Sequence, residues 1–348
     1  ERGALNRLLT LTPEEKAAGV IAASAGNHAQ GLAYHGHRLG VPVTIVMPEN
    51  TPLVKVVHTQ EMGARVIQHG TVFDDAYARA VELAERERLT LIHAFDDPDV
   101  IAGQGTIGLE LLEDGLPFDT VLVPVGGGGL IAGIATAIKA LKPEVKVIGV
   151  EAALVPSMAA ALRDEEVGVT ERTIADGIAV RKVGRIAVDV VRELVDGLIA
   201  VTEEEIAHGV QLLLEIEKTL VEGAGAVGLA ALLHHADEVP GEAAALVLSG
   251  GNMDVTMLAK IIEKGLIADG RLARLSVRVP DVPGTLAAVT SVISALGGNI
   301  RDVIHQRAFL DVPIGETQVD LTLETRSKAH IEEIAEALRR KGYRVISN

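Results

Sequence analysis

Three short motifs carry the residues of this sequence that could bind a charged ligand. The first reads SAGNHAQG over residues 24–31, the second GGGG over 126–129, and the third SGGN over 249–252. Each follows a short apolar run that is typical of a buried strand, and the first two precede a helical pattern. Proteins of the α/β class bind ligands at the carboxyl ends of their strands. We therefore place the candidate ligand site in a crevice at these strand ends.

The glycine run has the chemistry of an anion site. Because Gly126, Gly127, Gly128 and Gly129 have no Cβ, their backbone can come close to a ligand. Their N–H groups, together with the N-terminus of the helix that begins at Leu130, form a cradle that suits a phosphate. The alternative interpretation is a tight strand-to-helix turn that binds nothing.

The same segment also fits a dinucleotide-binding fingerprint. Gly127, Gly129 and Ala132 have the G-x-G-x-x-A spacing. Glu151 follows about 20 residues later at a strand end, where an acid would bind a ribose. This alternative predicts a nicotinamide-dependent dehydrogenase, and it leaves the other two motifs unexplained.

The first and third motifs place polar side chains at the same kind of position. Ser24 follows a strand, and Asn27 and His28 stand where a helix begins. These residues and the first N–H groups of the helix suit a carboxylate and a polar ring oxygen, although helix capping alone is the alternative. Ser249 would point its hydroxyl into the crevice.

Composition excludes several classes of function. The 348 residues contain no cysteine, so disulfides, thiolate metal sites and a cysteine nucleophile are excluded. A net charge of −16 argues against nucleic acid or an anionic membrane as a partner. Hydrophobic residues make up 48% of the chain and aromatic residues 2%, a mixture that suits buried parallel strands and the helices that cover them.

Strand and helix patterns alternate along most of the chain, which predicts βαβ units and parallel sheets. Residues 16–100 form a small α/β domain in this interpretation, and residues 1–15 and 101–270 form a large one. After a composition break at Gly265–Arg271 the pattern changes. Residues 271–348 show the β-α-β-β-α-β order of a ferredoxin-like domain. The expected fold class is α/β, with two α/β domains and a C-terminal ferredoxin-like domain.

The motifs SAGNHAQG, GGGGL and SGGN, in this order, resemble those of the fold-type II pyridoxal-phosphate enzymes, and within that family the threonine/serine dehydratases. ADGIAV at Ala175–Val180 and EGAGAVGLAAL at Glu222–Leu232 are also similar to segments of the family. The family's lysine motif is S-F-K-x-R-G-A, and this sequence opens with ERGA at residues 1–4. The resemblance therefore places the cofactor-bearing lysine immediately before Glu1.

The resemblance implies a role for each motif residue. Asn27 would hydrogen-bond the ring oxygen of pyridoxal phosphate, Gly177 would line the ring, and Ser249 would face the pyridine nitrogen. The residues implied for the phosphate are Gly126, Gly127, Gly128, Gly129 and Leu130, and those implied for the substrate carboxylate are Ser24, Asn27 and His28.

The implied reaction follows from these roles. A neutral hydroxyl at the ring nitrogen would not keep that nitrogen protonated, which favours elimination of a β-hydroxyl over transamination. The resemblance thus predicts conversion of L-threonine to 2-oxobutyrate and ammonia, with L-serine to pyruvate as a second reaction. Free amino acids are the expected small-molecule partners, and the expected location is the cytoplasm.

Two positions depart from related patterns. Ala25 stands where serine racemases carry a second serine, so racemisation is not expected. Glu151 matches the glutamate of the family's divalent-cation site, but Ser157 replaces the aspartate of that site. One charged oxygen ligand is poor for a hard cation. No metal is therefore expected, and Glu151 is the one residue that would contribute to such a site.

The C-terminal segment resembles a single ACT regulatory domain. DVPGTL at residues 281–286 and GGNI at 297–300 match its two turns. The resemblance implies a homo-oligomer, dimer or tetramer, that binds an amino-acid effector such as isoleucine near Gly284 and Asn299. A packing module without an effector is one alternative. A non-catalytic amino-acid-sensing homologue is a further hypothesis for the whole chain.

Overall fold

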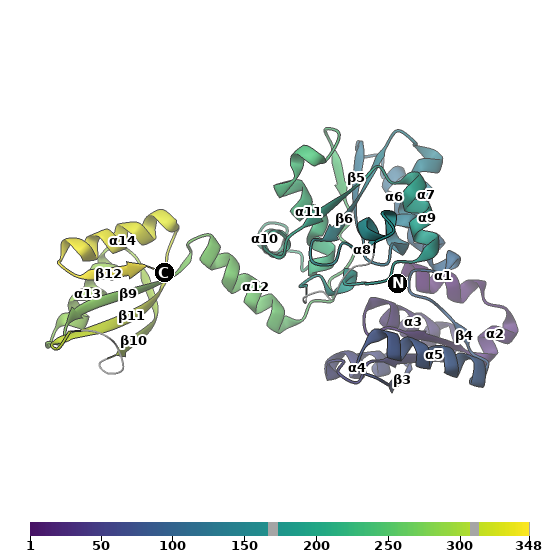
Figure 1. Ribbon diagram of the computed structural model, residues 1–348, viewed down its shortest axis with the longest axis horizontal. Coiled ribbons are helices and arrows are strands. Elements are labelled where there is room, and N and C mark those ends of the chain that lie inside the picture. Colours follow the sequence, from purple (N-terminus) through teal and green to yellow (C-terminus); the bar gives the residue numbers. More distant parts are fainter. Residues whose placement is uncertain (166–172, 307–312, 348) are drawn as a thin grey trace. The chain divides into compact units, whose positions relative to one another are not determined.

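The computed structural model describes residues 1–165, 173–306 and 313–347. These residues fall into two compact units, Glu1–Asp254 and Val255–Asn348. Two parallel sheets form the first unit and one antiparallel sheet forms the second (Figure 1). In the described part of the chain, the helices are too short or too polar to cross a membrane. The predicted α/β fold class, with a ferredoxin-like domain at the C-terminus, is confirmed.

The smaller sheet of the first unit has the strand order β3-β2-β1-β4, with all strands parallel. Every residue of the central strand β1 is buried, as expected for a strand covered on both faces. The strands are β1 (Val20–Ala23), β2 (Val43–Met47), β3 (Arg65–Gln68) and β4 (Thr90–Leu91), and the connecting helices are α3 (Asn27–Leu39), α4 (Leu53–Glu61) and α5 (Phe73–Glu87).

The larger sheet of the first unit has the order β7-β6-β5-β8 and is also parallel. Its strands are β5 (Thr120–Pro124), β6 (Lys146–Ala152), β7 (Gly197–Val201) and β8 (Ala244–Leu246). The helices that cover it include α7 (Gly129–Leu141), α9 (Arg185–Leu194), α10 (Glu203–Glu215) and α11 (Gly223–His234).

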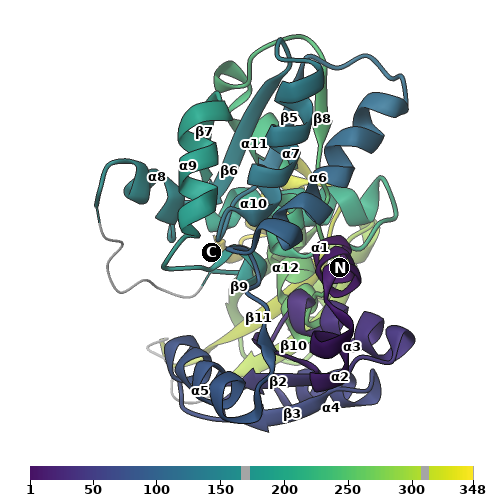
Figure 2. The same ribbon diagram turned by 90° about the vertical axis from the view of Figure 1, so that its right-hand side faces the viewer.

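Alternate residues of β5 belong to different cores. Val121 and Val123 pack with α7 and α9, whereas Leu122 packs with α10 and α11. The sheet is therefore covered on both faces, as the all-apolar sequence of β5 predicts (Figure 2).

The helix α1 (Arg2–Thr10) packs against both α3 and α6 (Pro98–Glu113), so it joins the layers of the two sheets. Two glycines let α1 and α6 approach closely, because a Cβ on Gly103 would lie 2.6 Å from Gly3 Cα. Arg7 Nε donates to Asp97 Oδ2 at 3.1 Å across the same junction. Short elements that were not predicted from the sequence include α2 (Pro13–Ala18), α8 (Ser157–Leu162), the strand β7, and the 3-10 helices η1 (Asp176–Ile178) and η2 (Ala236–Glu238).

The second unit has the predicted β-α-β-β-α-β order and the strand order β10-β11-β9-β12. Alternate residues of β9, Leu275, Val277 and Val279, pack with Val289 of α13 and Ile334 of α14, so both helices cover one face. The elements are α12 (Val255–Ala268), β9 (Leu272–Pro280), α13 (Thr285–Ala295), β10 (Asn299–Gln306), β11 (Glu316–Glu324), α14 (Lys328–Arg340) and β12 (Arg344–Ser347). The helix α12 is part of this unit, whereas the sequence interpretation placed residues up to 270 in the large domain.

Candidate active site

The candidate site lies at the carboxyl ends of strands from both sheets of the first unit. The helix α3 begins shortly after β1, α7 begins shortly after β5, and Ser249 follows β8. The first turns of α3 and α7 therefore present free N–H groups and the positive ends of two helix dipoles at these strand ends.

The glycine loop, residues 126–129, is buried and closely enclosed. A Cβ at Gly127 would lie 2.3 Å from Phe95 Cγ, and a Cβ at Gly126 would lie 2.7 Å from Ile178 Cα. Gly128 has φ +90°, a left-handed conformation that favours glycine. The loop therefore has no room for a side chain at these positions.

The donors of the glycine loop fit a phosphate. Among the described residues, the N–H groups of Gly126, Gly127 and Gly128 have no acceptor, and the first N–H groups of α7 have no partner within the helix. Buried amides without an acceptor are rare in folded proteins. Phosphate oxygens would satisfy all of them, so the loop matches the phosphate group of pyridoxal phosphate.

Asn27 is held by a buried carboxyl group that the sequence analysis did not assign to the site. Its Nδ2 donates to Glu222 Oε1 at 3.2 Å. Gly177 and Gly250 leave room for this carboxyl, since a Cβ at either residue would lie 3.0 or 2.5 Å from Glu222 Oε1. Asn27, Gly177 and the third motif are thus brought together around Glu222.

Glu222 is anchored by the backbone of the third motif. Its N–H donates to the Gly250 carbonyl at 3.0 Å, and its carboxyl accepts the N–H of Asn252. Burial raises the pKa of Glu222, and the hydrogen bond from Asn27 opposes that rise. The sequence held one signal for this role of Glu222. The residue stands directly before a helix that is rich in glycine and alanine, a composition typical of a buried helix.

The N-terminus of α3 is open to an anion. Ser24 Oγ accepts the N–H of Gly26 at 3.2 Å, and among the described residues no side chain caps the helix. His28 Nε2 lies 3.4 Å from the Ile92 carbonyl, and burial lowers the pKa of His28 to about 4. The His28 ring is therefore neutral at pH 7. Ser249 is exposed.

Residues at the start of the chain lie beside α3. A Cβ at Gly31 would lie 3.1 Å from Glu1 Cα, and Glu1 Oε2 is 2.8 Å from Nε2 of the buried His35. Gly31 is one turn along α3 from Asn27. The position where the resemblance expects the cofactor-bearing lysine therefore adjoins the helix that carries Asn27.

Glu151 serves as the N-terminal anchor of α8. Its Oε1 accepts the N–H of Met158 at 2.7 Å and its Oε2 accepts the N–H of Ala159 at 3.0 Å. The residue is 1% exposed, and burial raises its pKa. Over the described residues, no cluster of three or more metal-binding side chains occurs. Both carboxylate oxygens of Glu151 therefore bind the first turn of α8.

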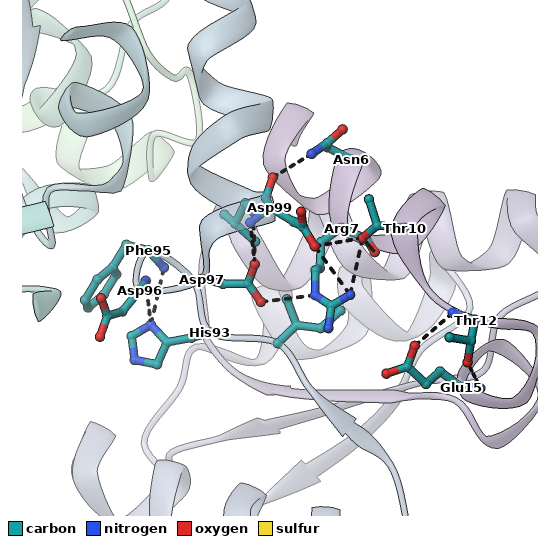
Figure 3. A network of polar contacts seen from close by, with 12 residues as sticks. Asn6, Arg7, Thr10, Thr12, Glu15, His93, Phe95, Asp96, Asp97 and Asp99 are labelled. Atoms are coloured by element: carbon teal, nitrogen blue, oxygen red, sulfur yellow. Dashed lines mark hydrogen bonds and ion pairs between the residues drawn. The ribbon is translucent and has the colours of Figure 1, made fainter. Parts of the chain in front are cut away.

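The segment that joins β4 to α6 lies against the glycine loop. The Phe95 ring occupies the space beside Gly127. Asp96 Oδ1 accepts the N–H of Ile186 at 2.9 Å, and the N–H of Gly184 donates to the Gly127 carbonyl at 2.9 Å. Figure 3 shows this segment, in which His93, Phe95 and Asp96 form a compact turn. The sequence analysis assigned no role to these residues.

Comparisons with known proteins show the family to which the chain is similar. Residues 1–250 match the family described as pyridoxal-phosphate dependent enzyme, and residues 273–342 match the ACT domain. The chain is 49% identical to the L-threonine ammonia-lyase of Thermotoga maritima, over 99% of this chain and 86% of the relative. It is 48% identical to the L-threonine ammonia-lyase of Geobacter sulfurreducens, with the same two coverages.

Solved structures show the same architecture. Threonine deaminase isoform 2 from Solanum lycopersicum is 40% identical with a TM-score of 0.71, over 75% of this chain and 73% of that chain. Maize serine racemase is 33% identical with a TM-score of 0.71, over 77% of this chain and 83% of that chain.

Proposed function

The chain belongs to the family of pyridoxal-phosphate-dependent enzymes and carries an ACT domain, and from this premise we propose that it converts L-threonine to 2-oxobutyrate and ammonia. The observation that carries the proposal is that Asn27, Gly177 and Gly250 lie around Glu222, together with a glycine loop whose N–H groups have no acceptor among the described residues. The two relatives named L-threonine ammonia-lyase support the choice of substrate.

Different residues of the site would bind the phosphate, the substrate carboxylate and the ring of the cofactor. The N–H groups of the glycine loop and of Leu130 would bind the phosphate, and the open N-terminus of α3 would bind the substrate carboxylate. Asn27 has a second Nδ2 hydrogen, which would donate to the ring oxygen while the first remains on Glu222. Ser249 would face the ring nitrogen.

Removal of the α-proton starts the reaction, and the expected base is the lysine that the resemblance places before Glu1. When bound, pyridoxal phosphate supplies the electron sink for the pair left on the α-carbon. Loss of the β-hydroxyl and hydrolysis then yield the 2-oxo acid and ammonia.

L-Serine is proposed as a second substrate. The groups named above contact the carboxylate and the cofactor, which are common to both amino acids, and none of them contacts the threonine methyl group. Racemisation is not proposed, because Ala25 offers no acid or base at the position where serine racemases carry a serine. The dehydrogenase hypothesis is less favoured, because it needs Glu151 to bind a ribose and both oxygens of Glu151 already accept N–H groups of α8.

We propose that the ACT domain binds an amino-acid effector near Gly284 and Asn299. Gly284 adopts φ +91° at the N-terminus of α13, and a Cβ there would meet no atom within 4 Å. Asn299 Nδ2 donates to Glu324 Oε2 at 2.8 Å, which fixes the amide of Asn299. We also propose that the protein is a homo-oligomer, either a dimer or a tetramer, and that it is located in the cytoplasm.

The test is an oxo-acid assay on the protein expressed from its complete reading frame. Threonine and serine are supplied separately, with and without isoleucine, and cofactor binding is followed by its visible absorption. We expect 2-oxobutyrate from threonine and pyruvate from serine. Absence of 2-oxobutyrate from a protein that carries the cofactor would refute the proposed reaction, and binding of a nicotinamide nucleotide instead would revive the dehydrogenase hypothesis.

A further inference from the structure

A row of aromatic rings runs from α5 to the glycine loop. The chain has only four phenylalanines and three tyrosines. Phe73 stacks on Tyr77 with ring centroids 6.1 Å apart, and Tyr77 meets His93 edge-on at 5.5 Å. His93 meets Phe95 edge-on at 4.6 Å, and the Phe95 ring lies against Gly127. The row therefore ends at the loop whose free amides fit a phosphate.

His93 sets the turn that places Phe95. Its Nδ1 accepts the N–H of Asp96 at 3.0 Å and lies 3.4 Å from the N–H of Phe95 (Figure 3). A side chain that accepts from the backbone two and three residues later is the device by which Asn, Asp, Ser and Thr shape turns. For Nδ1 to accept, the ring must be neutral with its proton on Nε2.

Both residues whose amides His93 holds reach the glycine loop. Phe95 packs on it directly, since a Cβ at Gly129 would lie 2.9 Å from Phe95 Cα. Asp96 reaches it through the segment 184–186, whose Gly184 N–H donates to the Gly127 carbonyl. That last bond turns the Gly127 carbonyl toward Gly184 and leaves the loop N–H groups for a ligand.

We propose that His93 is a positioning residue for the cofactor phosphate. By accepting the two amides, it keeps Phe95 and Asp96 against the glycine loop, so that the loop holds the conformation in which its N–H groups meet the phosphate. This inference rests on the proposed function, because it takes the ligand of the loop to be the phosphate of pyridoxal phosphate.

The surroundings of His93 favour the neutral ring. Burial lowers its pKa, and the carboxylates of Asp96 and Asp97 oppose that effect. His28 of α3 lies close enough for the charge of His93 to lower the pKa of His28, and Tyr77 of α5 faces the His93 ring. Protonation would set an Nδ1–H against two N–H donors, so the turn is expected to open at acidic pH.

Two substitutions separate the acceptor from the ring. His93→Asn keeps an acceptor, Oδ1, near the position of Nδ1 but removes the ring, and His93→Phe keeps a ring without an acceptor. The dissociation constant of pyridoxal phosphate is measured by absorption titration for the full-length protein and both variants. Loss of a hydrogen bond of about 1 kcal/mol predicts roughly fivefold weaker binding by His93→Phe, with His93→Asn within about twofold of the wild type. Equal binding by His93→Phe and the wild type, or equal weakening in both variants, would overturn the proposal.

A second measurement decides the matter even where His93→Phe fails to fold, as circular dichroism would show. The ratio of the dissociation constants of the wild type and His93→Asn is followed from about pH 8 down to the lowest pH at which both proteins stay folded, because burial lowers the pKa of His93 below that of an ordinary histidine. This ratio cancels the titration of the cofactor itself. It should rise as pH falls, because only the wild type gains a proton at this position, and a constant ratio contradicts the role of His93. A wild type that binds no pyridoxal phosphate at all would instead refute the proposed function.

Discussion

Glu222 shows how one buried side chain can link residues that the sequence keeps far apart. Its carboxyl accepts from Asn27, and its backbone N–H donates to Gly250. Burial raises the pKa of this carboxyl, which means that the folded state favours the protonated form. The ionised form therefore opposes folding, and this cost is absent below the unfolded pKa and complete above the folded pKa.

Substitution of Glu222 by glutamine should reveal this cost. Glu222→Gln keeps an oxygen for Asn27 but cannot ionise, so it should raise the melting temperature relative to the wild type at about pH 8 and lose that advantage near pH 4. Glu222→Ala removes the acceptor and should lower kcat/KM for threonine by roughly tenfold or more. If the melting temperatures of the wild type and Glu222→Gln depend on pH in the same way, burial does not raise the pKa of the Glu222 carboxyl.

Gly127 should tolerate no side chain. A Cβ there would lie 2.3 Å from Phe95 Cγ, so Gly127→Ala must displace Phe95 or the loop, at a cost of about 1–3 kcal/mol. Gly228 is the matched control, because it is buried in α11 and its Cβ would make an ordinary 3.6 Å contact with Leu122 Cβ. Gly228→Ala should leave the affinity for pyridoxal phosphate unchanged. Equal affinities in the two variants would mean that the loop does not bind the cofactor.

Among single residues, the sequence predicts those that belong to a recognisable local motif. Asn27 and the glycine loop stand at strand-to-helix turns, where backbone conformation leaves a signature. Glu222 leaves only its place directly before a helix of glycine and alanine, and His93 leaves no signature, because their roles depend on contacts made after folding. Asn27 and Glu222, for example, are 195 residues apart. Glu151 was misleading for the reverse reason, since its spacing fits a ribose site while its oxygens anchor α8.

Asp196 joins three elements of the larger sheet. It precedes β7, accepts the N–H of Val147 in β6 at 2.9 Å, and pairs with Lys139 of α7 and Lys146 of β6 at 2.7 and 2.9 Å. Burial alone would raise the pKa of this carboxyl. The hydrogen bonds from the two lysines and from Val147 outweigh burial and lower the pKa from 3.8 to about 2.

The stability that Asp196 contributes should depend on pH in a defined window. Because its folded pKa is lowered, the contribution is complete above the unfolded value and is lost as pH falls through about 2. The shift corresponds to about 2 kcal/mol. Asp196→Asn should lower the free energy of unfolding by roughly that amount at pH 7, as measured by urea titration.

The control for this prediction is the exposed carboxylate of Asp189. Asp189→Asn should change the free energy of unfolding little, because the contact of Asp189 with Arg192 is long and exposed. A loss at pH 7 no larger than that of Asp189→Asn would contradict the assignment.

Elements with strong periodicity were predicted closely, and short ones were not. The apolar run Val43–Met47 predicts a strand and the spacing of Arg185–Leu194 predicts a helix, and both have these bounds in the structure. The sequence also predicts a strand at Leu91–His93, but the strand is β4, Thr90–Leu91, because the chain turns at His93. The helix α8 begins where Glu151 accepts its first N–H groups, a tertiary contact that no local pattern reveals.

Over the whole molecule, the sequence predicted the order of the sheets because strand and helix patterns alternate and then change after residue 271. It did not predict that α12 would be part of the second unit. That helix has the apolar pattern of the preceding ones, and only its contacts with β9 place it. The division matters for regulation, since the residues proposed for the effector belong to the second unit and those proposed for the cofactor and substrate belong to the first.

Asn299→Ala tests whether such coupling exists. The substitution removes the amide that Glu324 holds at 2.8 Å, far along the chain from the residues proposed for catalysis. We expect kcat/KM for threonine without effector to stay within about twofold of the wild type, and the concentration of isoleucine for half-maximal response to change by roughly tenfold or more, a coupling of ordinary size. If isoleucine has no effect on the wild type, the other amino acids are screened in the same assay.

Thr290→Ala is the matched control, because in the described part of the chain the Thr290 hydroxyl donates to carbonyls of its own helix. Since binding and response are linked, calorimetry on both variants should show the same change in affinity as the rate assay. An unchanged response in Asn299→Ala would place the effector elsewhere, and a wild type indifferent to every amino acid would make the second unit a packing module.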